Sequence, residues 1–423
     1  MLRIPYGVTG AELHRDISGA EILESQIGTL KAEDSEDELV RKAMAAPIGS
    51  PRLSELARGK KTATIIVSDH TRPVPSKHIL PFMLAELREG NPDIDITLLI
   101  ATGFHRATTR EELAAKVGEE LASREKFVCH DSRDASSNVE IGVLPSGARL
   151  VIDRLAAETD LLVAEGFIEP HFFAGFSGGR KSVLPGVCDQ VTVLGNHCSK
   201  FIDSPYARTG ILEGNPLHTD MVAAAKLAKL QYIVNVVIDE DKKVAAAFAG
   251  DPFQAHEAGC SFLKGYCRVK PQQKGDIVVT SNGGAPLDQN VYQSVKGLTA
   301  AEAAAAPGAV LIISSRCNDG VGGDSFYKAL HECDTLEHLM ERILATPMDQ
   351  TDPDQWEYQI LCRMMLKHRI IFVSEPSMQK TLEDMKLEYA PDLDTALERA
   401  YAEKGPDAHL VIIPNGISVI VEP

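Results

Sequence analysis

The chain has 423 residues, of which 44% are hydrophobic and 24% are charged, a mixture typical of a soluble globular protein rather than a disordered or fibrous one. Its length exceeds that of one typical hydrophobic core, so two domains are expected. The formal net charge of −17 excludes broad binding to nucleic acid or to anionic membranes, because such binding needs clustered Lys and Arg.

The N-terminus predicts no export signal. No segment approaches the run of ~18 apolar residues that spans a bilayer, and residues 1–16 carry charge where a signal peptide needs an apolar stretch. We therefore expect a cytoplasmic protein. Eight cysteines occur at scattered positions without a C-x-x-C pair, which favours free, mostly buried thiols over a zinc site or a disulfide framework.

Short β-branched runs alternate with helical patterns along the chain, and this alternation predicts βα units and a mainly parallel sheet. In the first part of the chain, the predicted strands are 62–68, 94–101, 161–167 and 232–238. A helix is predicted over 76–90, ending at Gly90. A second helix is predicted from about residue 109, where Thr109 and Glu112 have the spacing of a capping box.

A change in composition over 268–275 predicts a linker, and the alternation of strands and helices restarts after it. The predicted strands of this second part are 276–281, 309–315, 369–374 and 409–414. The alanine-rich stretch 300–306 is expected to be helical. The sequence thus predicts an α/β fold with two domains, residues 1–270 and 271–423, mainly parallel sheets, and an active site in the cleft between the domains.

Polar residues follow several predicted strands, at the sheet edge where open α/β folds bind their ligands. In chain order these residues are Asp69, His70, Thr71, Arg72, His105, His171, Lys181, Tyr292, Gln293 and Lys296. Each also has a plain structural explanation: Asp69 and Thr71 could cap a helix, and Tyr292 and Lys296, at i and i+4, could form a solvated helix face. Their recurrence at successive strand ends favours a functional site.

The loop 175–182, G-F-S-G-G-R-K-S, is compared with the P-loop pattern G-x-x-x-x-G-K-[ST]. It does not match, because Lys181 lies two places after Gly179 instead of one and the preceding strand ends too early. Its glycines could still let backbone amides face an anion, so a non-catalytic phosphate- or nucleotide-binding protein is the alternative prediction. That alternative gives no reason for three histidines and a lysine at the same strand ends.

Five segments together resemble the nickel-dependent lactate racemase family. They are DHTRPVP (69–75), TGFHR (102–106), EPHFFAGFSGGRKSVLPG (169–186), LGNH (194–197) and NGGAPLDQNVYQSVKG (282–297). They cover the predicted first domain and the start of the second, and the combination is specific although each piece alone is weak. The resemblance implies an isomerase, a racemase or epimerase of lactate or another 2-hydroxy acid, which depends on other proteins to synthesise its cofactor.

The resemblance also implies a role for each matching residue. Members of the family carry a nickel-pincer nucleotide, a pyridinium mononucleotide whose two sulfur-bearing arms hold nickel. The position of Lys181 tethers it as a thioamide, and that of His197 supplies a nickel ligand. Asp69, His70, Thr71 and Arg72, with Gly178 and Gly179 of the loop, are expected to line the cofactor. His105 and His171 correspond to the acid and base. Arg72, Tyr292, Gln293 and Lys296 are expected to surround the substrate carboxylate.

These implied roles agree with the chemistry of a 2-hydroxy acid. Its carbon-bound hydrogen is a poor acid, so inversion is easier by hydride transfer to an electrophilic ring while a base takes the hydroxyl proton. Two imidazoles suit a reaction that runs in both directions, because their pKa lies near neutrality. Sulfur arms with one imidazole favour a square-planar late metal. Phe172, Phe173 and Phe176 are expected to exclude water around Lys181.

Overall fold

Apolar runs of the first half of the chain form a six-stranded sheet that is buried on both faces, as a parallel sheet covered by helices must be. The structure, a computed structural model, describes residues 2–422. In spatial order the strands are β13 (Val244–Gly250), β12 (Leu230–Ile238), β9 (Leu161–Phe167), β4 (Thr62–Ser68), β5 (Asp95–Ala101) and β6 (Lys126–Cys129). Only β13 runs antiparallel to its neighbour.

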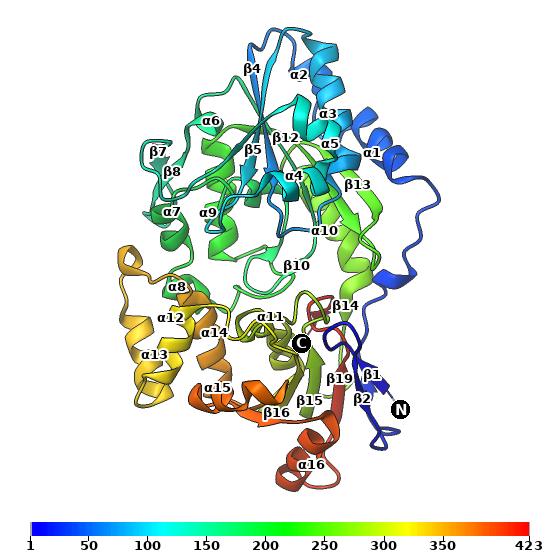
Figure 1. Cartoon of the computed structure of the whole chain (residues 1–423), viewed down its shortest axis with the longest axis vertical. Helices are drawn as coiled ribbons and strands as arrows, with labels where there is room; N and C mark the ends of the chain where they lie inside the picture. Colours follow the sequence, from blue (N-terminus) through cyan, green and yellow to red (C-terminus); the bar gives the residue numbers. More distant parts are fainter. Residues whose placement is uncertain (1, 423) are drawn as a thin grey trace.

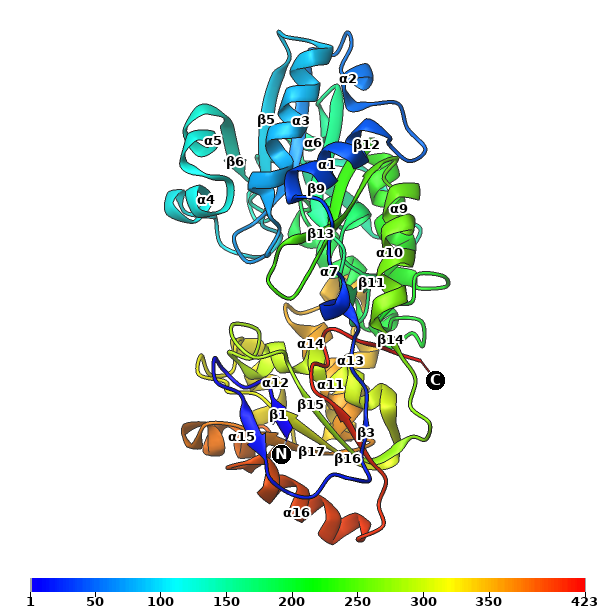
Figure 2. The ribbon, with the colours of Figure 1, turned by 90° about the vertical axis from the view of Figure 1, so that its right-hand side faces the viewer.

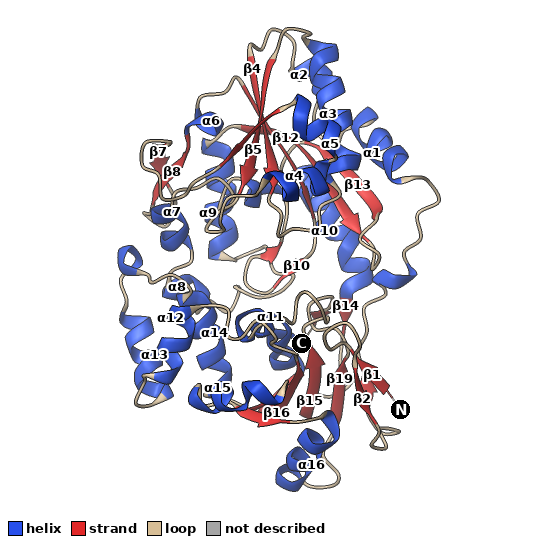
Figure 3. Cartoon of the chain, viewed as in Figure 1, coloured by secondary structure: helices blue, strands red, loops and turns tan. Residues whose placement is uncertain are grey.

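Helices pack on both faces of this first sheet (Figure 3). The helices of the first half are α1 (Glu36–Ala45), α2 (Leu53–Leu56), α3 (Ser76–Gly90), α4 (Arg110–Val117), α5 (Glu119–Arg124), α6 (Arg154–Ala157), α7 (Gln190–Asn196), α8 (Ser199–Ile202), α9 (Pro216–Leu227) and α10 (Gln254–Cys267). Of these, α1, α3, α6, α9 and α10 contact strands of the sheet. A small hairpin, β7 (Asn138–Val143) with β8 (Arg149–Asp153), lies beside α6 and α7. The capping box at Thr109 is formed as predicted, since its side chain accepts from the Glu112 amide.

A second six-stranded sheet is parallel throughout. Its order is β18 (Glu388–Ala390), β17 (Arg369–Val373), β16 (Ala305–Ser314), β15 (Gly275–Ser281), β19 (Leu410–Ile413) and β3 (Glu21–Ile22). The edge strand β3 comes from the N-terminus, as does the hairpin of β1 (Leu2–Ile4) and β2 (Ala11–Leu13) that packs beside this sheet. The division at residue 270 stays a prediction, and it does not anticipate this placement of the first 22 residues.

The helices of the second half are α11 (Val291–Ala304), α12 (Asp324–His331), α13 (Leu336–Ala345), α14 (Gln355–Met365), α15 (Gln379–Asp384) and α16 (Leu393–Lys404). Of these, α11 packs on β15 and β16, and α16 covers the other face together with β2. The helices α12, α13 and α14 form a separate layer, and α14 contacts both α11 and α8 of the first half.

The two halves are joined by more than one crossing of the chain (Figure 2). One hydrophobic cluster contains Phe172 and Phe173 of the first half together with Leu298 and Trp356 of the second. In addition, β14 (Arg268–Val269) pairs with the last strand, β20 (Ile420–Val421). Across residues 2–422, no helix combines the length and the apolar character that a membrane crossing needs.

The strand orders define where each sheet can bind a ligand. In the first sheet the chain runs outward from β4 to β5 and β6 on one side and from β9 to β12 on the other, so its switch point lies between β4 and β9. In the second sheet the corresponding point lies between β15 and β19. The segment after β9, which forms a hairpin of β10 (Pro170–His171) and β11 (Gly175–Phe176), lies with α11 between the two sheets (Figure 1).

The α/β class with mainly parallel sheets is confirmed. Seven of the eight predicted strands and the helix 76–90 agree with the structure to within about two residues, and all eight cysteines are free. The alanine-rich stretch 300–306 is only partly helical, because α11 ends at Ala304 and β16 begins at Ala305. Alanine has a high helix propensity, but here the tertiary pairing of β16 with β15 decides the backbone conformation.

Candidate functional site

The hairpin β10–β11 presents His171 and two phenylalanines toward the second half of the molecule. The His171 ring stacks on Phe172, with centroids 5.0 Å apart, and meets Phe173 edge-on at 4.6 Å. The Ala174 amide donates to Nδ1 of His171 at 3.3 Å, which fixes the orientation of the ring. Burial, followed by the nearby cation of Lys181, lowers the pKa of His171 well below its usual value, so the imidazole is neutral.

His197 follows α7 and lies on the other side of Phe173, with ring centroids 5.2 Å apart. Its Nδ1 donates to the Val193 carbonyl at 3.0 Å, so Nε2 of the neutral ring keeps a free lone pair. Burial lowers the pKa of His197 to about 3, and the Lys181 cation adds to this effect. The imidazole is therefore unprotonated at neutral pH, as a metal ligand must be.

Lys181 lies in the short 3₁₀ helix Gly179–Ser182, and its Nζ is 5.7 Å from the centroid of Phe173. No carboxylate among the described residues forms an ion pair with it. Burial lowers the pKa of its amine well below the usual value, and the cations of Arg180 and Arg72 lower it further. A lysine in such a place is a good nucleophile, because the neutral amine is the reactive form.

Three predicted substrate residues lie on the first turns of α11, which Asn290 caps by accepting from the Gln293 amide. Nζ of Lys296 is 6.0 Å from the centroid of Phe172 and donates to Oε1 of Gln293 at 2.6 Å. The Tyr292 hydroxyl lies in the same region and accepts from Nε1 of Trp356 at 3.1 Å. The predicted shared helix face is thus formed, and it faces the aromatic residues of the first half.

Asp69 and His105 form a hydrogen-bonded pair at the ends of β4 and β5. Nδ1 of His105 lies 2.6 Å from Oδ2 of Asp69, and Thr71 donates its hydroxyl to the other carboxylate oxygen at 2.7 Å. Burial opposes ionisation of Asp69, but the hydrogen bonds from His105 and Thr71 outweigh it and lower the pKa. An ionised Asp69 requires a proton on Nδ1 of His105, so Nε2 of that ring is free to accept a proton.

The two remaining residues after β4 differ in their placement. The Arg72 side chain is exposed and without a carboxylate partner in the described chain, and its charge lowers the pKa values of His171, Lys181 and Lys296, in each case after the larger effect of burial. His70 instead bonds to Thr108 at 3.1 Å, on the side of α4. The structure gives His70 no contact with the aromatic cluster, and its role in cofactor binding stays a prediction.

Two site residues on α14 were not identified from the sequence. The Trp356 ring is 5.0 Å from His197 and 6.3 Å from Phe104, so it links the His197 region to the loop that carries His105. Glu357 is 1% exposed, and burial raises its pKa to about 8, although Lys296 opposes this effect. No motif marks either residue, because they belong to a helix, buried on nearly all sides, that only the tertiary fold brings to the site.

The glycine loop is packed against the protein rather than open to a ligand. Gly178 and Gly179 have φ values of +82° and +54°, and a Cβ at either would lie 2.7 Å from atoms of Asn235, Phe167 or His256. The Gly179 amide donates to Asn235 at 2.7 Å instead of facing an anion. This counts against the alternative of a phosphate-binding loop, and contact of these glycines with a cofactor stays a prediction.

The prediction that Phe176 excludes water around Lys181 is wrong. Phe176 does not shield Lys181, because its ring belongs to a separate hydrophobic cluster with Cys260 and Leu263 of α10. The chain reverses at the β10–β11 hairpin, so Phe172 and Phe173 face the second half while Phe176 faces away. Trp356 completes the aromatic enclosure that Phe176 was expected to provide.

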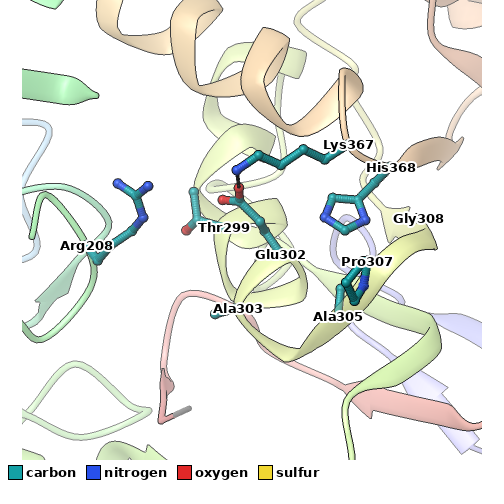
Figure 4. A pocket seen from close by; sticks show the side chains of 9 residues that line it. All are labelled: Arg208, Thr299, Glu302, Ala303, Ala305, Pro307, Gly308, Lys367 and His368. Atoms are coloured by element: carbon teal, nitrogen blue, oxygen red, sulfur yellow. Dashed lines mark ion pairs between the residues drawn. The ribbon is translucent and has the colours of Figure 1, made fainter. Parts of the chain in front are cut away.

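A cavity of about 490 Å³ lies further along α11, beyond the site residues (Figure 4). It is lined by Arg208, Thr299, Glu302, Ala303, Ala305, Pro307, Gly308, Lys367 and His368. Its acid is already neutralised, because Arg363 binds Glu302 through two hydrogen bonds and Lys367 lies 3.9 Å from it. The cavity therefore borders an ion-pair network that joins α11 to α14, and it includes none of the predicted site residues.

Comparison with known proteins gives matches over nearly the whole chain. The family model of the lactate racemase N-terminal domain matches residues 10–210, and that of the lactate racemase C-terminal domain matches residues 270–421. The lactate racemase of Thermoanaerobacterium thermosaccharolyticum is 50% identical over 423 residues, covering 99% of both chains. The lactate racemase of Lactiplantibacillus plantarum is 50% identical over 400 residues, covering 95% of this chain and 94% of the relative.

Solved structures agree. The structure of the lactate racemase apoprotein from Thermoanaerobacterium thermosaccharolyticum superposes with a TM-score of 0.96 at 50% identity, covering 100% of this chain and 99% of the other. A crystal structure of a Thermotoga maritima protein has a TM-score of 0.66 at 18% identity, covering 92% of this chain and 98% of the other, and it supports the fold alone.

Proposed function

The chain belongs to the lactate racemase family and is thus an isomerase, and on this premise we propose that it interconverts the enantiomers of lactate or a related 2-hydroxy acid with a nickel-pincer nucleotide tethered at Lys181. The observation that carries the proposal is the convergence around Phe172 and Phe173. Lys181, His171 and His197 of the first half and Lys296 of the second half all contact one of these two rings.

The residues present fit such a cofactor. Lys181 offers an amine whose pKa burial lowers well below its usual value, which favours a covalent bond, and His197 offers a free Nε2 for one metal coordination position. Among residues 2–422 no group of three or more His, Cys, Asp or Glu could hold a metal ion, so the remaining ligands would come from the cofactor. When bound, the pyridinium ring of that nucleotide supplies an electrophile for reversible transfer of the hydrogen on the hydroxyl-bearing carbon.

His105 and His171 are suited to opposite halves of one proton transfer. Nδ1 of His105 donates to Asp69, so its Nε2 presents a lone pair that can take the substrate hydroxyl proton. His171 can return a proton to the keto oxygen only as an imidazolium that has first taken a proton from solvent, and giving this proton up restores the neutral ring that burial favours. Rotation of the planar keto acid between these steps gives the opposite enantiomer, and the reverse reaction exchanges the two roles.

The substrate carboxylate would bind where positive charge is concentrated in an otherwise acidic protein. The Arg72 guanidinium is free of any carboxylate partner in the part of the chain described, and it can bind a carboxylate through two parallel hydrogen bonds. Lys296 and Gln293 are already bonded to each other and face Phe172. Closing this region with Phe172, Phe173 and Trp356 excludes water, which strengthens each charged hydrogen bond.

The proposal is tested by intact-mass spectrometry and metal analysis of protein produced with the cofactor-synthesis proteins. We expect a covalent adduct located by peptide mapping at Lys181, about one nickel per loaded chain, and racemisation of D- and L-lactate or of another acid in a panel of 2-hydroxy acids. The Lys181→Ala variant should carry no adduct. The matched control is Lys264→Ala, because Lys264 also lies over an aromatic ring of the loop, Phe176 at 5.5 Å, but on its opposite side. A nickel-loaded, active protein without mass at Lys181 would contradict the proposal.

The same proposal includes the cellular setting. The substrate is a small 2-hydroxy acid, the cofactor-synthesis proteins act as transient partners, and neither nucleic acid nor membrane binding is required. Because a cytoplasmic pathway would supply the cofactor, we place the enzyme in the cytoplasm. Measuring nickel and adduct in protein from hosts with and without the pathway tests the dependence on these partners.

A further inference from the structure

Arg180, the neighbour of Lys181, is a fully buried cation that has no acidic partner among residues 2–422. Its side chain is 1% exposed, and it is the largest of the side chains that are completely enclosed. No described carboxylate pairs with it, and burial lowers the pKa of its guanidinium to about 10. Placing an unpaired charge in a protein interior is unfavourable, so the surrounding structure must compensate with hydrogen bonds.

The compensation comes from neutral groups of the loop itself. Nη2 donates to the Ala174 carbonyl at 2.7 Å, and Nη1 donates to the carbonyls of Phe176 at 2.7 Å and Gly178 at 3.2 Å. Three alternate residues of the loop therefore point their carbonyls at one guanidinium. The planar, forked shape of arginine suits this arrangement, because a lysine ammonium could not reach all three in the same plane.

One histidine accepts from the guanidinium, and a second packs against it. Nε of Arg180 donates to Nδ1 of His218 on α9 at 3.0 Å, whereas Nε2 of His256 on α10 lies 3.1 Å from Nη1 and donates to the Ser177 carbonyl at 2.9 Å. Burial lowers the pKa of His218 to about 4 and that of His256 well below its usual value, and the Arg180 charge lowers both further. Both rings are neutral at physiological pH, so the guanidinium joins the loop to two helices without a competing charge.

The bonded segment is the one that carries the chemistry. His171 pairs with Gly175 across the hairpin, and its Nδ1 accepts from the amide of Ala174, the residue whose carbonyl accepts from Arg180. Lys181 directly follows Arg180, and the Lys181 amide donates to the Gly178 carbonyl. A single side chain thus connects the shape of the His171 hairpin to the direction of the Lys181 amine.

The charge of Arg180 acts on Lys181 as well. After burial, it is the largest of the causes that lower the pKa of the Lys181 amine. The neutral amine is the form that attacks a thiocarboxyl carbon, where the new C–N bond replaces a C–O bond and water leaves to give the thioamide. The guanidinium therefore both places the nucleophile and favours its reactive form.

We propose that Arg180 is a positioning residue for cofactor attachment, whose buried guanidinium shapes residues 174–181 around itself and fixes the direction in which the Lys181 amine is presented. The proposal depends on the proposed function only for the identity of the group attached. Its test is therefore made first on the apoprotein, where the state of the Lys181 amine can be measured without any cofactor.

The experiment is competitive acetylation of the apoprotein with isotopically labelled acetic anhydride between pH 6 and 10, followed by peptide mass spectrometry of Lys181. In the wild type, the Lys181 amine should titrate well below an exposed lysine of the same digest, such as Lys380. In Arg180→Met, loss of the cation should raise the midpoint by at least about one pH unit, which lowers the neutral fraction at pH 7 about tenfold. Arg180→Lys keeps the charge and should keep a low midpoint.

The fraction of chain that carries the cofactor distinguishes the effect of the Arg180 charge from the effect of its forked geometry. With the synthesis pathway present, the fraction of chain carrying an adduct at Lys181 should fall at least fivefold in Arg180→Lys as well as in Arg180→Met, because neither can bind three carbonyls. Arg363→Met is the matched control, since Arg363 is 9% exposed and bonds bidentately to Glu302 away from the loop. It should lower thermal stability but leave both the Lys181 midpoint and the adduct fraction unchanged.

Each outcome decides the proposal. If Arg180→Met does not fold, Arg180→Lys with normal adduct formation overturns the positioning role, and Arg180→Lys with a low midpoint but little adduct supports it. A wild-type midpoint in folded Arg180→Met overturns the electrostatic part. A wild type that never gains mass at Lys181, while its amine still titrates low, refutes the proposed function and leaves the Arg180 effect on the amine standing.

Discussion

The hydrogen bond between His105 and Asp69 allows a quantitative test by the substitution Asp69→Asn. The side chain keeps its size, but the carboxylate that accepts from Nδ1 of His105 at 2.6 Å is replaced by an amide. Asp69 is 1% exposed, so water does not replace the lost acceptor. A hydrogen bond to a charged group contributes about 1.5–3 kcal/mol, and at 1.4 kcal/mol per factor of ten kcat/KM should fall roughly 10- to 150-fold.

The assay is racemisation of D- and L-lactate by protein loaded with cofactor, with rates divided by the adduct fraction from intact-mass spectrometry. The control is Thr71→Val, which removes the hydroxyl that donates to the other carboxylate oxygen at 2.7 Å. It should lower kcat/KM less than about fivefold, because Nδ1 of His105 keeps its carboxylate acceptor. If Asp69→Asn retains at least half of the wild-type kcat/KM at equal loading, Asp69 does not set the orientation of a catalytic His105.

Three further predictions concern Trp356, Glu357 and Asn235. Trp356→Phe keeps an aromatic ring against His197 but loses the donor to the Tyr292 hydroxyl. In steady-state kinetics, KM for the hydroxy acid should rise about two- to tenfold with a smaller change in kcat. An unchanged KM would refute this prediction. The pKa of Glu357 is about 8 in the folded protein and about 4.3 in the unfolded chain. Between these two values the folded state holds a proton that the unfolded state has released. Protonated Glu357 therefore contributes its full stability below about pH 4.3, and this contribution is lost as the pH rises toward 8. Urea unfolding of Glu357→Gln apoprotein should accordingly show a less negative slope of stability with pH over this window, by up to about 1.4 kcal/mol per pH unit, whereas parallel slopes would contradict the assignment. Asn235→Ala leaves the buried Gly179 amide without its acceptor and should destabilise the apoprotein by about 1–3 kcal/mol in urea, and a loss below about 0.5 kcal/mol would show that the loop relaxes without this bond.

The sequence predicted the parallel sheets well because their strands are locally recognisable. The strand 62–68 is rich in β-branched residues and the strand 161–167 is a short, mostly apolar run, and both match the structure without error. The strand β3 has only two residues, Glu21 and Ile22, and its partner lies at the opposite end of the chain. Two residues carry no periodicity, so no local pattern could predict that the N-terminus completes the second sheet.

The candidate site likewise contains residues that a local sequence pattern indicates and residues that only tertiary packing brings to it. His171, Lys181 and Lys296 lie in segments that follow strands, and the rule that ligands bind at the carboxyl ends of strands makes them candidate site residues from the sequence. Trp356 and Glu357 reach the site from α14, which follows no strand end and whose approach depends on the packing of α14 against α11 and α8. Arg180 was overlooked for another reason: in the sequence it is one cation beside another, and only its burial shows that the loop is built around it.

The pairing of β3 with β19 has a consequence for biosynthesis. Val411 of β19 aligns with Glu21 of β3, about 390 residues apart in the chain. At about 5–20 residues per second, the ribosome needs roughly 20–80 s between these two points. During this time the first half can close its own sheet, whereas the N-terminal arm, with Ile4 and Leu13 destined for a fully enclosed core, waits without its partner. The nascent arm is therefore the segment of this enzyme that a chaperone would be expected to protect longest.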